Sequence, residues 1–128
     1  MQVFKTRVFA RFARGERIPD GSLSEAIERA ERGLVDANLG GGVIKQRVPR
    51  AGQGRSGGYR VLIAYRAKHR GVFLYGFAKS ERNNIDPAEL VTLREIAGKW
   101  LAADTKRIVQ ALNEGVLQEV TYDEKEED

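Results

Sequence analysis

Apolar and polar positions alternate with a period of two in the middle of the chain. One parity holds Tyr59, Val61, Ile63 and Tyr65, and the other holds Arg60, Leu62, Ala64 and Arg66. This alternation predicts a strand whose tyrosine-containing side faces a core. Residues 72–78 form a second apolar run after the polar connection 67–71, so we expect the two strands to pair as an antiparallel hairpin.

Weaker strand patterns precede this hairpin. Residues 3–12 alternate in part and predict a half-buried strand, whose end is left open because residues 9–14 could begin a helical turn. Gly15, Pro19 and Gly21 predict a loop over residues 14–21. Residues 42–48 predict a short strand, and residues 116–122 fit either a last edge strand or an ordered arm.

Two segments have the three- and four-residue spacing of amphipathic helices. The first covers residues 23–37, with Ser22 and Glu25 spaced as a capping box and the glycines at 40–42 ending it. The second opens at Asp86 and carries apolar residues to Leu101, with a break near Asp104. The order of elements predicts an α+β protein, a small antiparallel β-sheet with helices packed on one face.

Length and charge distribution predict one domain with a distinct end. The chain has 128 residues, which suits a single core at residues 1–113. Residues 114–128 hold seven acidic residues against one lysine, so we expect an acidic C-terminal arm, in part disordered. Either this arm is simply solvated, or it folds back over a basic surface and competes with nucleic acid.

Composition excludes several classes of protein. The chain contains no cysteine, which rules out disulfides, zinc–thiolate sites and cysteine nucleophiles. It has no apolar run of transmembrane length and no apolar stretch typical of a signal peptide, so we expect a cytoplasmic protein with no membrane association. Acidic clusters for metal-dependent nuclease chemistry are missing from the predicted sheet, and no metal or other cofactor is expected.

A long stretch of the chain carries charge of one sign only. No acidic residue lies between Asp36 and Glu81, whereas about six would be expected there from the overall composition. The same stretch carries nine cations: Lys45, Arg47, Arg50, Arg55, Arg60, Arg66, Lys68, Arg70 and Lys79. A one-signed basic field attracts polyanions, so the sequence predicts a surface for nucleic acid.

Strand geometry predicts which of these cations meet. Lys45 and Arg47 are two residues apart and share a face, while Ile44 and Val48 face the core. Arg60 has the opposite parity to the core-facing residues of its own strand. With a favourable register, Lys45, Arg47 and Arg60 therefore converge on one solvent-facing patch that can bind phosphate. The alternative is a solvated sheet face whose cations have no binding role.

Other residues are candidates for contacts to RNA. Lys79 and Arg82 follow the last predicted strand and could lie at the rim of the patch. Arg50 and Arg55 flank or occupy a glycine-rich loop over residues 50–58, which is either a phosphate-binding loop or a flexible connection. Tyr75 could stack on a base, although its face is undecided by the pattern. His69, between two cations in a predicted turn, is expected to face solvent.

Three blocks of sequence resemble the RelE/HigB-like toxins of bacterial type II toxin–antitoxin systems, within the RelE/ParE superfamily. The blocks are Gly42-Val-Ile-Lys-Gln-Arg-Val, Gly54-Arg-Ser-Gly-Gly-Tyr-Arg-Val-Leu-Ile-Ala and Tyr75-Gly-Phe-Ala-Lys-Ser-Glu-Arg-Asn-Asn-Ile. The resemblance implies a twisted antiparallel sheet with helices against it. It also implies cleavage of mRNA on the translating ribosome, and neutralisation by a cognate antitoxin protein that covers the basic face.

The resemblance also implies roles for individual residues. Lys45 and Arg47 match the paired basic positions of the family, and Arg60 matches the arginine of its Gly-Tyr-Arg element. The family often has a further arginine and an aromatic residue near the exit of the last strand, where this chain has Ser80 and Asp86. Arg82 and Lys79 are the candidates to replace them, and the proton donor to the leaving group is left unassigned.

The combined interpretation is a metal-free mRNA endoribonuclease. A ribose 2′-hydroxyl attacks the adjacent phosphate, Lys45 is the candidate base, and Arg47, Arg60 and Arg82 stabilise the developing charge. Lys45 would need a lowered pKa for this role, which neighbouring cations favour. Two alternatives stay open: a ParE-like toxin that inhibits gyrase, and a nucleic-acid-binding protein without catalytic activity.

Overall fold

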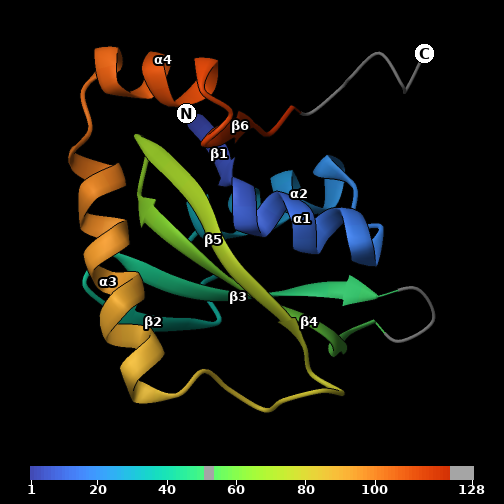
Figure 1. The fold of residues 1–128 in the computed structure, drawn as a ribbon. Coiled ribbons are helices and arrows are strands. Elements are labelled where there is room, and N and C mark those ends of the chain that lie inside the picture. Colours follow the sequence, from blue (N-terminus) through green and yellow to red (C-terminus); the bar gives the residue numbers. More distant parts are fainter. Residues whose placement is uncertain (51–53, 122–128) are drawn as a thin grey trace.

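The computed structural model describes residues 1–50 and 54–121, and the side chains of residues 54–56 are outside the description. The elements in chain order are β1 (Gln2–Thr6), α1 (Arg7–Glu16), α2 (Asp20–Glu31), β2 (Ala37–Gly40), β3 (Val43–Arg50), β4 (Gly54–Arg66), β5 (Arg70–Ala78), α3 (Pro87–Ala102), α4 (Thr105–Asn113) and β6 (Leu117–Glu119). Figure 1 shows the sheet between a pair of helices on one side and α3 on the other.

The six strands form one sheet in the order β2-β3-β4-β5-β1-β6. All neighbouring strands are antiparallel except β1 and β5, which run parallel. The α+β class and the β4–β5 hairpin are therefore as the sequence predicts. The last strand, β6, pairs with β1, so the segment that opens the acidic arm contributes to the sheet, while residues 122–128 lie outside the described residues.

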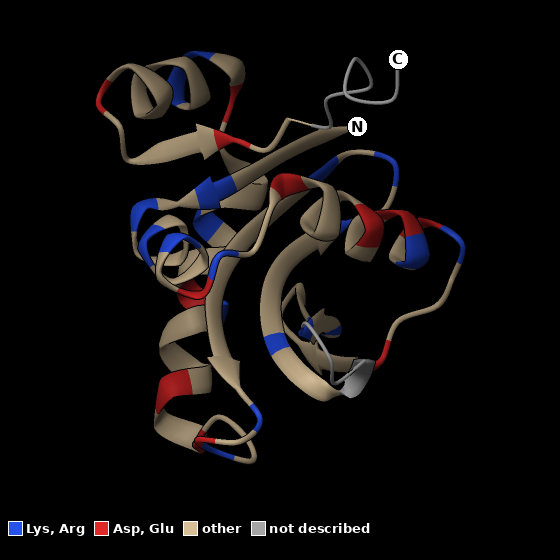
Figure 2. Ribbon diagram, turned by 90° about the vertical axis from the view of Figure 1, so that its right-hand side faces the viewer, with Lys and Arg blue, Asp and Glu red and all other residues tan. Residues whose placement is uncertain are grey.

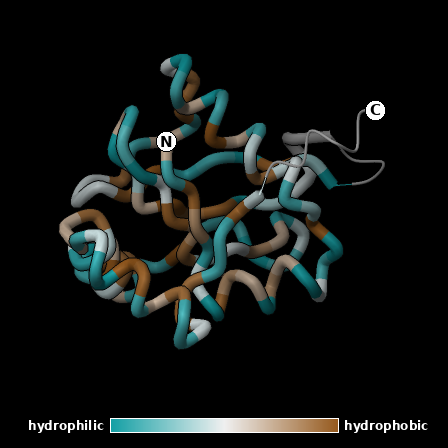
Figure 3. The backbone as a smooth tube through the Cα atoms, turned by 90° about the horizontal axis from the view of Figure 1, so that it is seen from above, coloured by the Kyte–Doolittle hydropathy of each residue, from teal (hydrophilic) through white to brown (hydrophobic). Residues whose placement is uncertain are grey.

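Helices cover both faces of the sheet, which corrects the expectation of helices on one face only. One core contains Tyr59, Val61 and Ile63 of β4 and lies beneath α1 and α2. A second core contains Leu62 and Ala64 of the same strand and lies beneath α3 and α4. Both parities of β4 carry apolar residues, so both faces need cover. Seen from above, the hydrophobic segments lie mainly in the interior of the molecule (Figure 3).

The N-terminal elements differ most from the sequence prediction. The first strand ends at Thr6, whose side chain accepts a hydrogen bond from the Phe9 backbone N–H and caps α1. Phe9 and Ala13, four residues apart, then both face the sheet from one side of a helix. The segment is therefore helical, and the predicted continuation of the strand is wrong. Close packing of this helix depends on Gly76 of β5, because a Cβ there would lie 2.4 Å from the Phe12 ring.

Residues 14–42 also differ from the prediction of a loop followed by a helix that glycines end. Helix α2 begins earlier, at Asp20 after Pro19, and the predicted Ser22 cap is wrong. It ends at Glu31, which leaves room for a strand, β2, that the pattern did not predict. The glycines at 40–42 all have positive φ. Gly40 ends β2, and Gly41 and Gly42 form the turn to β3, so none of them ends a helix.

The C-terminal helices agree with the sequence. Asp86 and Glu89 form the predicted capping box at the start of α3. The helical segment is interrupted before Asp104, as predicted, and Asp104 caps α4 by accepting a hydrogen bond from the Arg107 backbone N–H. Trp100 is half-buried against the second core, with the Arg107 guanidinium 5.1 Å from its ring centroid.

Arg70 is a buried residue that ties the end of α3 to the sheet. Its side chain donates to the backbone oxygens of Trp100 and Ala103, both at 2.7 Å, and to Gln2 Oε1 at 3.0 Å. Burial, followed by the nearby charge of Arg66, lowers the pKa of Arg70. The guanidinium therefore completes the hydrogen bonding of carbonyls that the helix leaves free.

Replacing Arg70 with alanine is expected to lower the free energy of unfolding by about 3 kcal/mol, because buried carbonyls lose their donors and a cavity opens. Urea denaturation measures the loss. The matched change Arg11→Ala, at an exposed position of α1, should alter stability by no more than about 0.5 kcal/mol. An Arg70→Ala protein as stable as the Arg11→Ala protein would contradict this role.

Candidate active site

The register of β3 and β4 brings two arginines directly opposite each other. Arg47 pairs with Arg60, and Lys45, two residues before Arg47, pairs with Leu62. Across the next pair of strands Arg60 lies opposite Phe77 and Leu62 lies opposite Tyr75. Side chains at paired positions share a face, so these residues lie together on the face covered by α3.

We call this group, completed by Arg82, the cationic cluster. Its members are Lys45, Arg47, Arg60 and Arg82, together with the aromatic residues Tyr75 and Phe77. The convergence of Lys45, Arg47 and Arg60 predicted from parity is therefore confirmed by the register. In Figure 2 the central strands carry blue segments but no red ones, in keeping with the absence of acidic residues from this part of the chain.

Arg60 is less accessible than the sequence suggested. It was expected on an open polar face, but it is only 9% exposed, because α3 covers the apolar neighbours that share its side of the sheet. Burial, and next the charge of Arg47, lower the pKa of Arg60, while the carboxylate of Asp36 opposes this shift. The guanidinium is thus held in a partly dehydrated place, where charge interactions are stronger than in water.

A β-bulge in β5 brings Tyr75 to the cluster. Leu62 pairs with Tyr75, and the next residue, Ile63, pairs with Phe73, so Leu74 is the extra residue. Without it, Tyr75 would share the face of Phe73 and lie beneath α1. The bulge therefore re-aims the tyrosine toward Arg60 and Arg82, a common function of bulges beside active sites.

Arg82 lies in the turn after β5, at the edge of the cluster. Its guanidinium lies 5.4 Å from the Phe77 ring centroid and donates to the Tyr75 hydroxyl at 3.3 Å. It also forms an ion pair of 2.6 Å with Glu89 at the start of α3. The hydrogen bond to Glu89 raises the pKa of Arg82, and the same bond lowers the pKa of Glu89. The arginine is therefore fixed at the rim by both an aromatic ring and a carboxylate.

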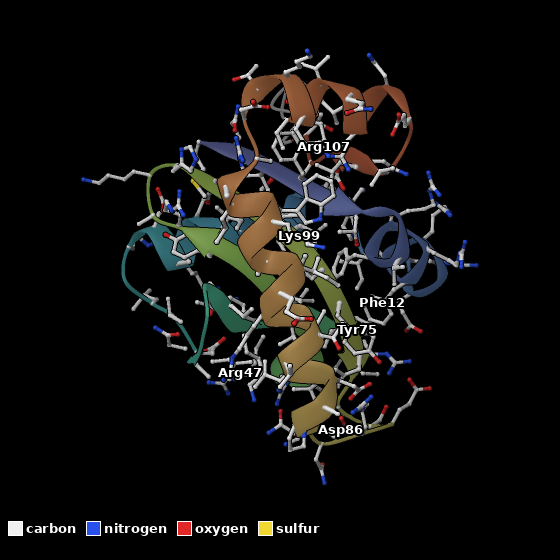
Figure 4. All side chains as sticks on the ribbon, turned by 60° about the vertical axis from the view of Figure 1, so that its left-hand side comes forward. Phe12, Arg47, Tyr75, Asp86, Lys99 and Arg107 are labelled. Carbon is white, nitrogen blue, oxygen red and sulfur yellow. The ribbon has the colours of Figure 1, made fainter. Side chains whose placement is uncertain are left out.

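Lys45 connects the strand to the same turn. Its Nζ donates to Asn84 Oδ1 at 3.4 Å, and the residue is half-buried. Figure 4 looks onto α3 and shows Asp86 where the helix begins, Tyr75 on one side of the helix and Arg47 on the other. The cluster thus lies around the first turns of α3, at the end of the sheet where β5 leaves it.

An acidic residue that the sequence reasoning left out contacts the cluster. Asp36 Oδ1 lies 3.3 Å from an Arg47 guanidinium nitrogen, and Asp36 Oδ2 accepts from the Arg47 backbone N–H at 2.7 Å. Arg29 of α2 lies 3.6 Å from the same carboxylate. The place of Asp36, as the last acid before the acid-free stretch, was the only signal in the sequence. Asn84 and Glu89 were missed as well, because only the folded turn brings them to the cluster. Phe77 was missed because its pairing with Arg60 depends on the register of β4 and β5.

Two of the predicted residues, Arg50 and Lys79, do not join the cluster. Arg50 lies on the other face of the sheet, with its guanidinium 5.5 Å from the centroid of the Tyr59 ring. It shares the parity of Val48, which faces the core beneath α1 and α2. Lys79 is exposed in the turn after β5, where its backbone N–H donates to the Gly58 carbonyl. The side chain of Arg55 lies outside the described residues.

Ser80 and Asp86, at the two positions where the family often has an arginine and an aromatic residue, have other surroundings here. Ser80 is exposed in the turn. Asp86 accepts from the Glu89 backbone N–H at 3.0 Å and caps α3. Its carboxylate is therefore engaged in starting a helix. His69 is exposed in the β4–β5 turn, as expected.

The cluster is suited to binding a phosphodiester and stabilising extra negative charge on it. Guanidinium groups remain charged and offer paired donors to phosphate oxygens. Within residues 1–50 and 54–121 no group of three His, Cys, Asp or Glu side chains is placed to hold a metal ion. In the same residues no helix is long and apolar enough to cross a membrane.

The fold and the cluster define a class, that of small α+β proteins with a cluster of arginines and a lysine on one face of the sheet. The family model described as "RelE toxin of RelE / RelB toxin-antitoxin system" matches residues 1–120. The chain therefore belongs to the RelE toxin family of type II toxin–antitoxin systems, and a cognate RelB antitoxin is its implied partner. A comparison with curated proteins found no match.

Proposed function

We propose that this protein is an mRNA endoribonuclease that works without a metal ion and cleaves transcripts on the translating ribosome. The observation that carries the proposal is the direct pairing of Arg47 with Arg60, beside Lys45, on one face of the sheet. Two guanidinium groups at adjacent strand positions can hold the two non-bridging oxygens of one phosphodiester. Membership of a family of toxins that are generally ribonucleases supports the same reading.

The proposed reaction is an intramolecular transesterification. The ribose 2′-oxygen forms a bond to phosphorus while the bond from phosphorus to the 5′-oxygen breaks, which leaves a 2′,3′-cyclic phosphate and a free 5′-hydroxyl. Lys45 takes the proton from the 2′-hydroxyl, and Arg47 and Arg60 stabilise the extra charge on the phosphoryl oxygens. Arg82 holds the phosphate from the rim of the cluster.

Tyr75 is our candidate for the proton donor to the leaving 5′-oxygen. Its hydroxyl lies in the cluster, 3.3 Å from an Arg82 nitrogen, and a phenol can donate a proton. The nearby Arg82 would stabilise the tyrosinate that forms during the transfer. Ser80 and Asp86 are poor candidates, because the first is exposed in the turn and the second caps a helix.

A Tyr75→Phe protein is expected to cleave RNA about 100-fold more slowly than the unchanged protein, with little change in RNA affinity, because the ring is kept and only the acid is lost. Single-turnover cleavage of a ribosome-bound mRNA measures the rate. Tyr65→Phe is the matched control, since that hydroxyl lies on the other face and bonds to Glu31. Equal rates for the two variants would remove Tyr75 from the role of acid.

The function is tested by mapping the 5′ ends of transcripts after brief induction of the protein in cells. We expect new ends inside open reading frames, appearing within minutes and missing from an Arg60→Ala strain. A DNA-damage response without new RNA ends would instead indicate inhibition of gyrase. RNA binding without new ends and without DNA damage would indicate a protein that binds nucleic acid and does not cut it.

The antitoxin is proposed to act by covering the cationic cluster. A partner that inserts acidic or aromatic residues near Arg47 and Arg82 would occupy the place of the phosphate. Mutations of the cluster would then weaken antitoxin binding and toxicity together.

A further inference from the structure

Arg47 is held from two sides by residues outside the cationic cluster. Asp36 accepts from its backbone N–H at 2.7 Å and lies 3.3 Å from its guanidinium. Arg29 of α2 donates to the Arg47 backbone carbonyl through one terminal nitrogen, and the other lies 3.6 Å from the Asp36 carboxylate. The backbone and the side chain of Arg47 are therefore fixed by one carboxylate and one buried arginine.

Arg29 makes these contacts in a place that is costly for a charge. It is 7% exposed, and its Nε has no hydrogen-bond partner among the described residues. Burying a guanidinium that is not fully hydrogen-bonded destabilises the protein unless a counter-charge is close. That counter-charge is Asp36. Arg29, Asp36 and Arg47 line one surface pocket.

Asp36 also acts on the electrostatics of the arginine pair. Arg47 and Arg60 occupy opposite positions on β3 and β4, so their like charges repel, and burial strengthens the effect. Burial raises the pKa of Asp36, but the hydrogen bonds and charge of Arg47, together with the charge of Arg29, more than offset this and leave the pKa below its usual value. Asp36 therefore stays ionised near neutral pH and provides a negative charge beside the pair.

We propose that Asp36 is a positioning residue, whose carboxylate holds Arg47 beside Arg60 in the RNA-free protein. There it provides the negative charge that the scissile phosphate provides when RNA is bound. Arg29 anchors the carboxylate to α2. This inference rests on the proposed function, because it assigns the arrangement to the preparation of the phosphate site. The consequence is that the site is assembled before substrate arrives, which is the condition for efficient electrostatic catalysis.

The kinetic test compares Asp36→Asn with Asp20→Asn in cleavage of a ribosome-bound mRNA. An asparagine oxygen can still accept from the Arg47 backbone N–H, so the change removes the charge and keeps the shape. We expect kcat to fall about 10- to 100-fold while KM stays the same or falls, because Arg47 is less well placed but the site becomes more positive. Asp20 is the matched control, since it also pairs with a cation, Lys5, and has a similar side-chain exposure of 23% against 20% for Asp36.

A second measurement does not need activity. In the Asp36→Asn protein three guanidinium groups lie close together without a counter-charge, so its melting temperature at low salt should fall by about 5 °C, and added salt should narrow the gap by screening the repulsion. Asp36→Glu keeps the charge and should stay closer to the unchanged protein in both melting and kcat. The Asp20→Asn protein should show a smaller dependence on salt.

The outcomes separate the two proposals. If the unchanged protein cleaves RNA and Asp36→Asn has the same kcat, or a higher KM alone, the positioning role is overturned while the proposed function stands. A melting gap for Asp36→Asn that salt does not alter overturns the role as well. If the unchanged protein does not cleave RNA, the proposed function fails, and a salt-dependent melting gap would still support Asp36 as the counter-charge of the arginines.

Discussion

Replacing Arg60 with alanine is expected to slow RNA cleavage about 10²- to 10³-fold and to abolish toxicity in cells. Arg60 lies opposite Arg47 and opposite Phe77, at the centre of the cationic cluster, and it is nearly buried. In such a place a guanidinium interacts with a phosphate far more strongly than an exposed one would. Rates are measured with purified protein on ribosome-bound mRNA, and toxicity by growth after induction.

The control for this change is Arg66→Ala. Arg66 lies six residues further along β4, on the same face, but it is exposed and remote from the cluster, with a weak bond of 3.4 Å to the Leu101 carbonyl. The Arg66→Ala protein loses one positive charge from the same strand, so any change in its cleavage rate measures the effect of net charge alone. Circular dichroism checks that both proteins are folded. A folded Arg60→Ala protein that stays as toxic as Arg66→Ala would exclude Arg60 from the chemistry.

Replacing Lys45 with arginine is expected to lower the cleavage rate about 10²- to 10⁴-fold, although the positive charge is kept. Arginine does not give up its proton in proteins and so cannot accept one from the 2′-hydroxyl. Lys45 lies two residues from Arg47 and contacts Asn84 of the turn, which places an amine at the edge of the proposed phosphate site. Single-turnover cleavage again measures the effect.

The matched control is Lys99→Arg, at an exposed position of α3 (Figure 4). It should cleave at the unchanged rate. RNA affinity should also be similar for the two variants, because neither loses a charge. If Lys45→Arg retains full activity while Lys45→Ala is inactive, Lys45 acts only through its charge and another group must be the base.

Alternation in the sequence was enough to predict the central sheet and one half of its site. Each residue of β4 between Tyr59 and Arg66 lies on the side that its parity predicts. Lys45 and Arg47 likewise share a face of β3. These predictions hold because a strand has a fixed period of two, so that side-chain direction follows from position alone.

Elements whose identity depends on tertiary contacts could not be predicted in this way. Residues 7–12 belong to a partly alternating pattern, yet they form most of α1, since Thr6 caps a helix that packs on the sheet over Gly76. The short strand β2 has only four residues, too few for its alternation to identify it, and is defined by pairing with β3. Both faces of the sheet proved to be covered, because the apolar residues on the Arg60 side also require burial.

The site shows the same division. The bulge at Leu74 places Tyr75 in the cluster. The bulge has no signature in the sequence, and an extra residue in a strand alters the face of everything after it. Arg50, in contrast, lies on the opposite face, where its parity with Ile44 and Val48 puts it. Asp36 was missed since its role comes from a contact across eleven residues, which joins a loop after α2 to the middle of β3.

The central claim is that Lys45, Arg47 and Arg60 form one site that cuts RNA by attack of a ribose 2′-hydroxyl. The most direct measurement is the chemistry of the RNA ends that the purified protein produces on ribosome-bound mRNA. We predict 5′-hydroxyl ends and 2′,3′-cyclic phosphates from the unchanged protein, and RNA that is still almost entirely intact after the same reaction time with the Arg60→Ala protein. Fragments that carry 5′-phosphates, or equal cleavage by the two proteins, would contradict the account.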